Sequence, residues 1–202
     1  MHYLKRKKVI SWALYDWANS AFATTVMAGF FPLFFKSFWA ADLSPVESTT
    51  VIGTTNSLAG LFIVLLAPIL GAYSDLGKLK KKFLAFFALL GVLSTGYLYF
   101  IPQGDWIIAA SLYALAVIGF SGGNIFYDSL IVSVSEQDQR NKVSSLGFSM
   151  GYLGGGLLFV INVLMYLNPA WFGLSSEIEA ILWSFLSVAI WWAVFSLPLF
   201  MS

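Results

Sequence analysis

Apolar residues dominate six long stretches of this chain, and short polar segments separate them. A helix needs about 20 mostly apolar residues to cross the hydrocarbon core of a bilayer. Six stretches meet this requirement, at residues 12–39, 46–73, 82–101, 106–129, 143–167 and 180–200. The pattern therefore predicts an all-α integral membrane protein with six transmembrane helices.

Basic residues indicate the orientation. Every Lys and Arg except Lys36 falls in one of three clusters, at residues 5–8, 78–82 and 140–142, and two apolar stretches separate consecutive clusters. The connections 40–45, 102–105 and 168–179 carry acids but no base. Because basic residues accumulate in cytoplasmic loops, we expect the amino terminus and all three clusters in the cytoplasm. Lys36 would extend toward the headgroups on the other side.

Two of the external connections end in a helix-start pattern. Ser44 and Glu47 flank Pro45 in a capping box, and Ser176 and Glu179 repeat the box. In such a box, the serine hydroxyl and the acid each accept a hydrogen bond from a backbone N–H of the first turn. Both patterns predict helix starts where hydropathy also places them.

Composition agrees with a membrane protein and excludes several classes. Hydrophobic residues make up 59% of the 202 residues and charged residues 10%, whereas soluble domains are nearer half apolar and a quarter charged. The chain has no Cys, and its one His, His2, lies near the terminus. We therefore expect no metal site and no thiolate chemistry. With the bases confined to loops, no surface for nucleic acid is expected.

The connection after the second stretch holds the most specific local pattern. Gly71 is followed by Asp75, then by Gly77, Lys78 and three further lysines. Gly71 would let two helices approach closely, Gly77 would permit a reversed turn, and Asp75 could cap a helix amino terminus. An ordinary basic cytoplasmic loop would explain the same residues.

This connection resembles the signature between helices 2 and 3 of the major facilitator superfamily. Here one residue separates the acid from the second glycine, where the family usually has two. The resemblance implies a charge relay of Asp75, Lys78 and Asp128 that stabilises the outward-open state. Asp128 takes part because it lies at the cytoplasmic end of the fourth helix.

Two longer segments narrow the resemblance to one branch of the superfamily. Residues 15–22 (YDWANSAF) and 143–155 (VSSLGFSMGYLGG) are similar to helices 1 and 5 of the vacuole-effluxer-like transporters, which include autophagy-related amino-acid exporters. The resemblance implies the amino-terminal six-helix bundle of a major facilitator fold, built from two inverted three-helix repeats over residues 1–202. We expect a carboxy-terminal six-helix half of the same protein as its partner, absent from this chain.

Polar residues inside the apolar stretches are candidates for a substrate path. A carboxylate in a membrane helix is costly unless it faces the protein interior or a water-filled cavity. Asp16 and Asn19 lie about one turn apart on the cytoplasmic side of the first helix, where Asp16 could bind a proton or a substrate amine. A helix cap or an interhelical hydrogen bond would explain Asp16 equally, and it is the interpretation that we favour for Asn19. Asn124 and Tyr127 are candidates because helices 1 and 4 line the superfamily's central cavity, although an interhelical bond also explains Asn124.

Glycines recur every four residues in the fifth helix, at Gly147, Gly151 and Gly155. This spacing forms a flat strip against which a neighbouring helix can lie. The strip partly resembles the glycine motif of superfamily exporters, with Tyr152 in place of its proline. We favour a packing role.

The sequence thus predicts a secondary active transporter, not an enzyme, that moves a small solute by alternating access. The resemblance suggests efflux of amino acids across a bacterial cytoplasmic membrane. The lipid bilayer, the solute and the second half are the expected partners. No cofactor is expected beyond a coupling proton. The alternatives are a non-transporting scaffold or accessory subunit, and a membrane-embedded lipid enzyme. Such an enzyme would need convergent acids or histidines, whereas the intramembrane acids reduce to Asp16 and Asp128, on different helices, with no His or Cys beside them.

Overall fold

Helices account for nearly the whole structure. The computed structural model describes the backbone of residues 2–77 and 79–202 and the side chains of residues 6–72 and 79–202. Within these residues, six helices are long and apolar enough to cross a membrane. They are Arg6–Trp39, Pro45–Ala72, Lys80–Phe100, Trp106–Val134, Arg140–Leu167 and Glu177–Met201. The prediction of an all-α membrane bundle is confirmed.

The first crossing is a continuous helix whose winding changes along its length. It begins as α1 (His2–Ala21), widens to a π-helix at η1 (Phe22–Phe30), tightens at α2 (Phe31–Phe34) and widens again at η2 (Phe35–Trp39). It therefore starts ten residues before the expected apolar stretch, because the basic cluster at residues 5–8 lies within the helix. π-helical turns are rare and often accompany functional sites.

The remaining crossings are single α-helices with short one-turn extensions. They are α3 (Pro45–Gly77), α4 (Lys80–Tyr97) with η3 (Leu98–Phe100), α5 (Trp106–Val134), α6 (Arg140–Leu167) with η4 (Pro169–Phe172), and α7 (Glu177–Met201). The helical backbone of α3 continues to Gly77 and that of α4 begins at Lys80, so most of the expected loop 74–81 is helical. Asp75 consequently lies in the last turns of α3, not at a helix amino terminus where it could act as a cap.

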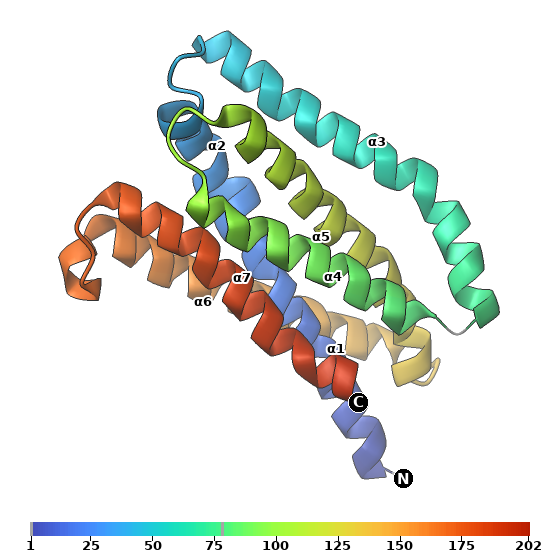
Figure 1. Cartoon of the computed structure of the whole chain (residues 1–202). Helices are drawn as coiled ribbons and strands as arrows, with labels where there is room; N and C mark the ends of the chain where they lie inside the picture. The colour runs from blue at the N-terminus through green and yellow to red at the C-terminus, as the bar shows by residue number, and fades with distance from the viewer. Residues whose placement is uncertain (1, 78) are drawn as a thin grey trace.

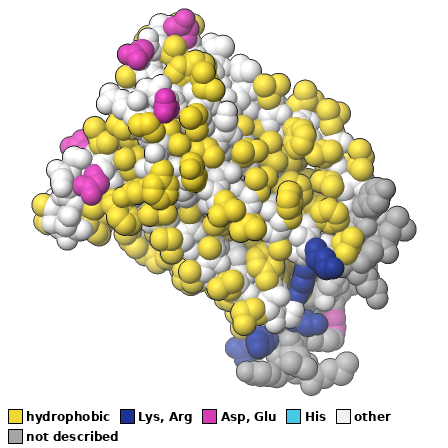
Figure 2. Space-filling model, viewed as in Figure 1, with side chains coloured by type: hydrophobic (Ala, Val, Ile, Leu, Met, Phe, Trp, Pro, Cys, Tyr) yellow, Lys and Arg dark blue, Asp and Glu magenta, His cyan; other side chains and the backbone are white. Residues whose placement is uncertain are grey.

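The helices form one bundle in which α1 packs against α5, α6 and α7. The helix α4 lies against α5 and α7, and α3 runs along one edge of the bundle beside α5 (Figure 1). Both termini lie at the same end (Figure 1), as an even number of crossings requires. In Figure 2, the visible Lys and Arg side chains gather at one end, and most visible acids lie at the other, with a hydrophobic surface between them. We call these the basic end and the acidic end.

The two predicted capping boxes are present at the acidic end, with one difference. The Ser44 N–H donates to Glu47 Oε2 at 2.9 Å, and the Glu47 N–H donates to Ser44 Oγ at 3.3 Å. At α7, the Glu179 N–H donates to Ser176 Oγ at 3.2 Å. The Glu179 carboxylate, however, accepts from the Ser175 N–H at 2.7 Å, one residue earlier than in the standard box.

Glycine permits the close approach of α4 to α5. A Cβ atom at Gly119 would overlap the backbone nitrogen of Gly91, and one at Gly122 would overlap the ring of Phe87. Between membrane helices, close packing of this kind replaces the hydrophobic driving force that lipid removes. By contrast, a Cβ at Gly156 on α6 would meet nothing within 4 Å.

These contacts predict different costs for the same substitution at two sites. Gly119→Ala should lower the free energy of unfolding by about 1–3 kcal/mol, because two backbones must move apart. Gly156→Ala should leave it unchanged or raise it by up to about 1 kcal/mol, because alanine favours helix more than glycine does. Unfolding of both variants by denaturant in detergent micelles measures the difference. Equal stability of the two variants would contradict the close α4–α5 contact.

Candidate functional site

The glycine strip of α6 lies directly against α1. A Cβ at Gly147 would stand 2.6 Å from the Trp12 ring, and one at Gly155 would stand 2.9 Å from the backbone oxygen of Ser20. Gly154, which the spacing did not single out, faces the backbone of Trp17 so closely that any side chain would collide with it. The strip therefore forms one long seam between the two helices.

Two hydroxyl groups of the first crossing lie in this seam, one in α1 and one in η1. Thr24 Oγ1 of η1 lies 3.1 Å from the carbonyl oxygen of Gly155 across the interface and 3.1 Å from that of Ser20 in its own helix, and either oxygen can accept its proton. Ser20 Oγ lies beside Gly151, where an added Cβ would approach it to 2.7 Å. Small residues on α6 and short polar residues on the first crossing thus fit one another, a combination common between membrane helices.

Asp16 lies in the same seam and is half-buried. Its Oδ1 accepts a hydrogen bond from Ser20 Oγ at 3.0 Å. A Cβ at Gly151 would come within 2.8 Å of that carboxylate oxygen. The carboxylate therefore fits at this position because residue 151 has no side chain. This links the predicted packing glycine to the predicted ionisable group.

A cavity of about 280 Å³ opens beside Asp16, between α1, α5 and α6. We call it the carboxylate cavity. Its lining residues are Trp12 and Asp16 from α1, Tyr127, Asp128 and Ile131 from α5, and Ser144 and Phe148 from α6. Asp16 and Tyr127 were candidates for the substrate path and Asp128 for the relay, and the structure brings all three to one cavity.

Aromatic rings form one wall of this cavity. The Trp12 ring stacks on the Tyr127 ring with centroids 4.4 Å apart and planes 9° from parallel. Trp12 Nε1–H also donates to the backbone oxygen of Tyr127 at 3.0 Å. The Tyr15 ring stacks on Tyr127 at 5.2 Å. Among the described residues, neither tyrosine hydroxyl has a hydrogen-bond partner, although both are buried.

Asn19 and Asn124 are joined to each other and do not line the carboxylate cavity. Asn19 Nδ2–H donates to Asn124 Oδ1 at 2.6 Å, and the Asn19 side chain is almost completely buried. This bond connects α1 to α5. Of the two interpretations of these asparagines, the geometry favours the interhelical hydrogen bond.

The residues expected to form the gate are only partly described. Lys78 lies outside the described residues, as does the side chain of Asp75, and Gly77 is the last residue of α3. Among the side chains that the structure describes, a Cβ at Gly71 would meet nothing within 4 Å. The expectation that Gly71 permits close approach of two helices is therefore wrong, because α3 lies along the edge of the bundle. Asp128 is described, and it lines the carboxylate cavity.

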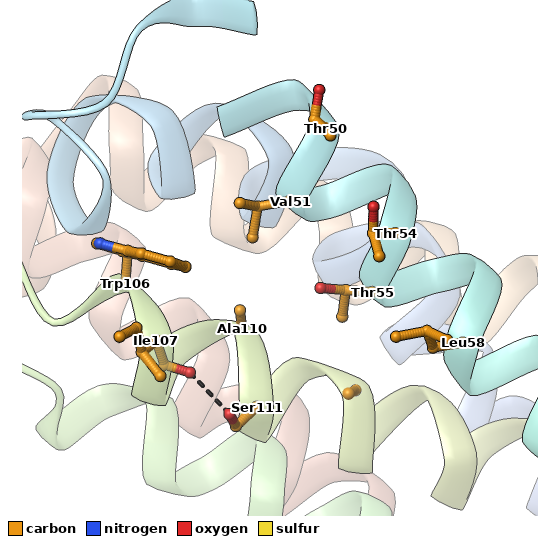
Figure 3. A pocket seen from close by; sticks show the side chains of 10 residues that line it. Thr50, Val51, Thr54, Thr55, Leu58, Trp106, Ile107, Ala110 and Ser111 are labelled. Carbon is orange, nitrogen blue, oxygen red and sulfur yellow. Dashed lines mark hydrogen bonds between the residues drawn. The ribbon is translucent and has the colours of Figure 1, made fainter. Parts of the chain in front are cut away.

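A second cavity, of about 370 Å³, lies between the acidic-end halves of α3 and α5 (Figure 3). It differs from the carboxylate cavity because no charged side chain is among its described lining residues. Thr50 and Ser111 donate their hydroxyl protons to backbone oxygens one turn earlier in their own helices, those of Val46 and Ile107. The carboxylate cavity is therefore the better candidate for binding a polar solute or ion.

Sequence comparisons point to one family. The family model described as "Vacuole effluxer Atg22 like" matches residues 4–132 and 132–202. The "Uncharacterized MFS-type transporter YxiO" of Bacillus subtilis (strain 168) is 39% identical over 200 residues, which cover 96% of this chain and 46% of that relative. An "Uncharacterized protein" of Aquifex aeolicus (strain VF5) is 30% identical over 159 residues, covering 77% of this chain and 38% of the relative. The chain thus spans less than half the length of these relatives. No solved structure matches it.

The Asn19–Asn124 bond predicts energetic coupling between the two positions. In a double-mutant cycle, Asn19→Ala and Asn124→Ala should be non-additive by about 0.6–1.7 kcal/mol, which runs from the average to the maximum found for hydrogen bonds between membrane helices. Asn19→Ala combined with Asn56→Ala is the matched control, because Asn56 accepts instead from the Tyr113 hydroxyl at 3.1 Å. The free energy of unfolding in bicelles is the measurement. Additivity in both cycles would contradict the bond.

Proposed function

The chain belongs to the vacuole effluxer Atg22-like family, and from that premise we propose that it forms one half of a secondary active transporter. The transporter would move a small solute across the membrane by alternating access. The observation that carries this proposal is a carboxylate, Asp16, held at a cavity between three membrane-length helices. An ionisable residue at such a place is typical of an ion or substrate pathway.

The second half of the carrier would be another six-helix bundle of the same protein. In carriers built from repeated bundles, the substrate site lies between the repeats near the middle of the membrane, and the bundles rock around it. The length of the relatives supports this arrangement, because the aligned residues cover only 46% and 38% of them. The basic end would lie in the cytoplasm, since basic residues mark that side.

Asp16 would take up the coupling proton. Its carboxylate borders a cavity, and Ser20 gives it one hydrogen bond. A group in this position can exchange a proton with the cavity and return to a less hydrated state when the cavity closes. The Asn19–Asn124 bond would hold α1 against α5 during that change. Asp128, with Asp75 and Lys78, would form the relay that steadies the outward-open state, as the family resemblance implies.

The solute is an amino acid in this proposal, and the direction is efflux. The name of the matching family, a vacuole effluxer, supports export, and the name of the Bacillus relative supports a transporter of the major facilitator type. A bacterial cytoplasmic membrane is the location that agrees with a bacterial relative. The cavity of about 280 Å³ is large enough for the polar end of an amino acid.

Transport assays test this proposal. Proteoliposomes containing the protein expressed from its complete gene should move at least one member of an amino-acid panel, and a pH gradient should accelerate the movement. Asp16→Asn should remove the effect of the gradient, because an amide cannot carry the proton. The control is Asp105→Asn, at the acidic end before α5. This variant should keep the effect of the pH gradient.

Two results would contradict the proposal. Full gradient dependence in Asp16→Asn would remove the proton role of Asp16. A lack of any movement across the panel, by protein that unfolds cooperatively in detergent, would favour a scaffold over a transporter.

A further inference from the structure

The chemistry of the carboxylate cavity is specific enough to indicate what it binds. Asp16 and Asp128 reach the cavity from different helices, and no Lys, Arg or His is among its described lining residues. Asp128 is exposed, and Asp16 is half-buried. Two carboxylates facing one small space repel an anion and each other. A cation between them would relieve this repulsion.

The protein itself supplies no such cation among the described residues. Asp16 receives its hydrogen bond from the neutral Ser20 hydroxyl. Tyr127 is only 5% exposed, and its buried hydroxyl has no hydrogen-bond partner among the described groups. Buried polar groups are rarely left without a partner, so one that borders a cavity calls for an explanation. Tyr127 lines the cavity, so a ligand bound there would lie against this side chain.

The aromatic walls distinguish an organic cation from a metal ion. Trp12, Tyr127 and Phe148 supply three of the seven lining side chains. Aromatic rings attract ammonium groups through their negative faces. Hard metal ions instead need six or more oxygen ligands. No group of three or more metal-ligating side chains occurs in the part of the chain that the structure describes.

From these observations we propose that the carboxylate cavity binds the ammonium group of an organic amine between Asp16 and Asp128, with the aromatic wall against the adjoining carbon atoms. The proposal rests on the transporter function, because the bound amine would be the end of the transported solute that faces the cytoplasm. It narrows the substrate class to molecules that carry a protonated amine. Amino acids belong to this class, and carboxylic acids without an amine do not.

A pair of probes of nearly equal size tests the proposal by binding alone. The complete protein is purified in detergent, and its thermal unfolding midpoint is measured with 2-phenylethylamine or with 2-phenylethanol. The amine should raise the midpoint in proportion to the logarithm of its concentration, because it binds the folded state. The alcohol, which lacks the charge, should leave it unchanged.

Variants connect the binding to the cavity. Asp16→Asn and Asp128→Asn should each weaken amine affinity about ten- to a hundredfold, the usual effect of losing a charged hydrogen bond. Phe148→Leu should weaken it less, and its 62% exposed ring makes misfolding of this variant unexpected. Asp105→Asn serves as the control and should bind like the unmodified protein.

Three results would overturn the ammonium site. They are equal shifts with amine and alcohol, unchanged affinity in both aspartate variants, and an Asp16-dependent shift caused by sodium chloride but not by the amine. Failure of the transporter proposal is distinguishable, because binding needs no gradient or membrane. Amine binding without transport of any amine would leave the site intact and remove the function. Transport with no preference for amines would leave the transporter function intact and remove the ammonium site.

Discussion

Close contact between helix backbones is the constraint on which this structure depends. Lipid is as apolar as the helix surfaces, so burial of apolar side chains gives little force for association in a membrane. Glycine restores that force, because two backbones can then approach within van der Waals contact. Two such contacts occur among the described residues, α4 with α5 at Gly91 and Gly119, and α1 with α6 along the glycine strip. The second contact also determines where the functional groups lie.

The seam between α1 and α6 joins packing to chemistry. Gly151 leaves space for the Asp16 carboxylate and the Ser20 hydroxyl on the facing helix. The carboxylate cavity opens beside this seam, lined by Trp12 and Asp16 of α1 and by Ser144 and Phe148 of α6, and α5 adds Tyr127 and Asp128 to it. A charged group is tolerated within the bundle because it borders this cavity. The proposed proton exchange and amine binding both follow from that position.

The sequence predicted the features that depend on local pattern. Hydropathy indicated the six crossings, and the serine–glutamate pairs indicated the starts of α3 and α7. Contacts between distant segments were harder to foresee. Asn19 and Asn124 are 105 residues apart, and nothing in either helix alone indicates that they bond to each other. Trp12, Ser144 and Phe148 were missed because aromatic and hydroxyl residues are common in membrane helices, although Trp12 lies one turn before Asp16. Gly71 was misjudged because a glycine shows that close packing is possible, not that a neighbour is present.

Cross-linking across the α1–α6 seam tests the central claim most directly, because the chain has no cysteine of its own. A Cβ at Gly151 would lie 2.7 Å from Ser20 Oγ. Two cysteines at these positions would therefore be close enough to bond, since the Cβ atoms of a disulfide lie about 3.8 Å apart. Ser20→Cys with Gly151→Cys should therefore form a disulfide in membranes, while the Asp16 carboxylate, which would lie 2.8 Å from the same Cβ, turns aside. A protease site inserted between α5 and α6 should then yield fragments that stay joined until a reductant is added. The fragments of the variant with Ser20→Cys and Gly156→Cys should separate without reductant, since a Cβ at Gly156 would meet nothing within 4 Å. Separation of both pairs would contradict the seam and the placement of Asp16 that depends on it.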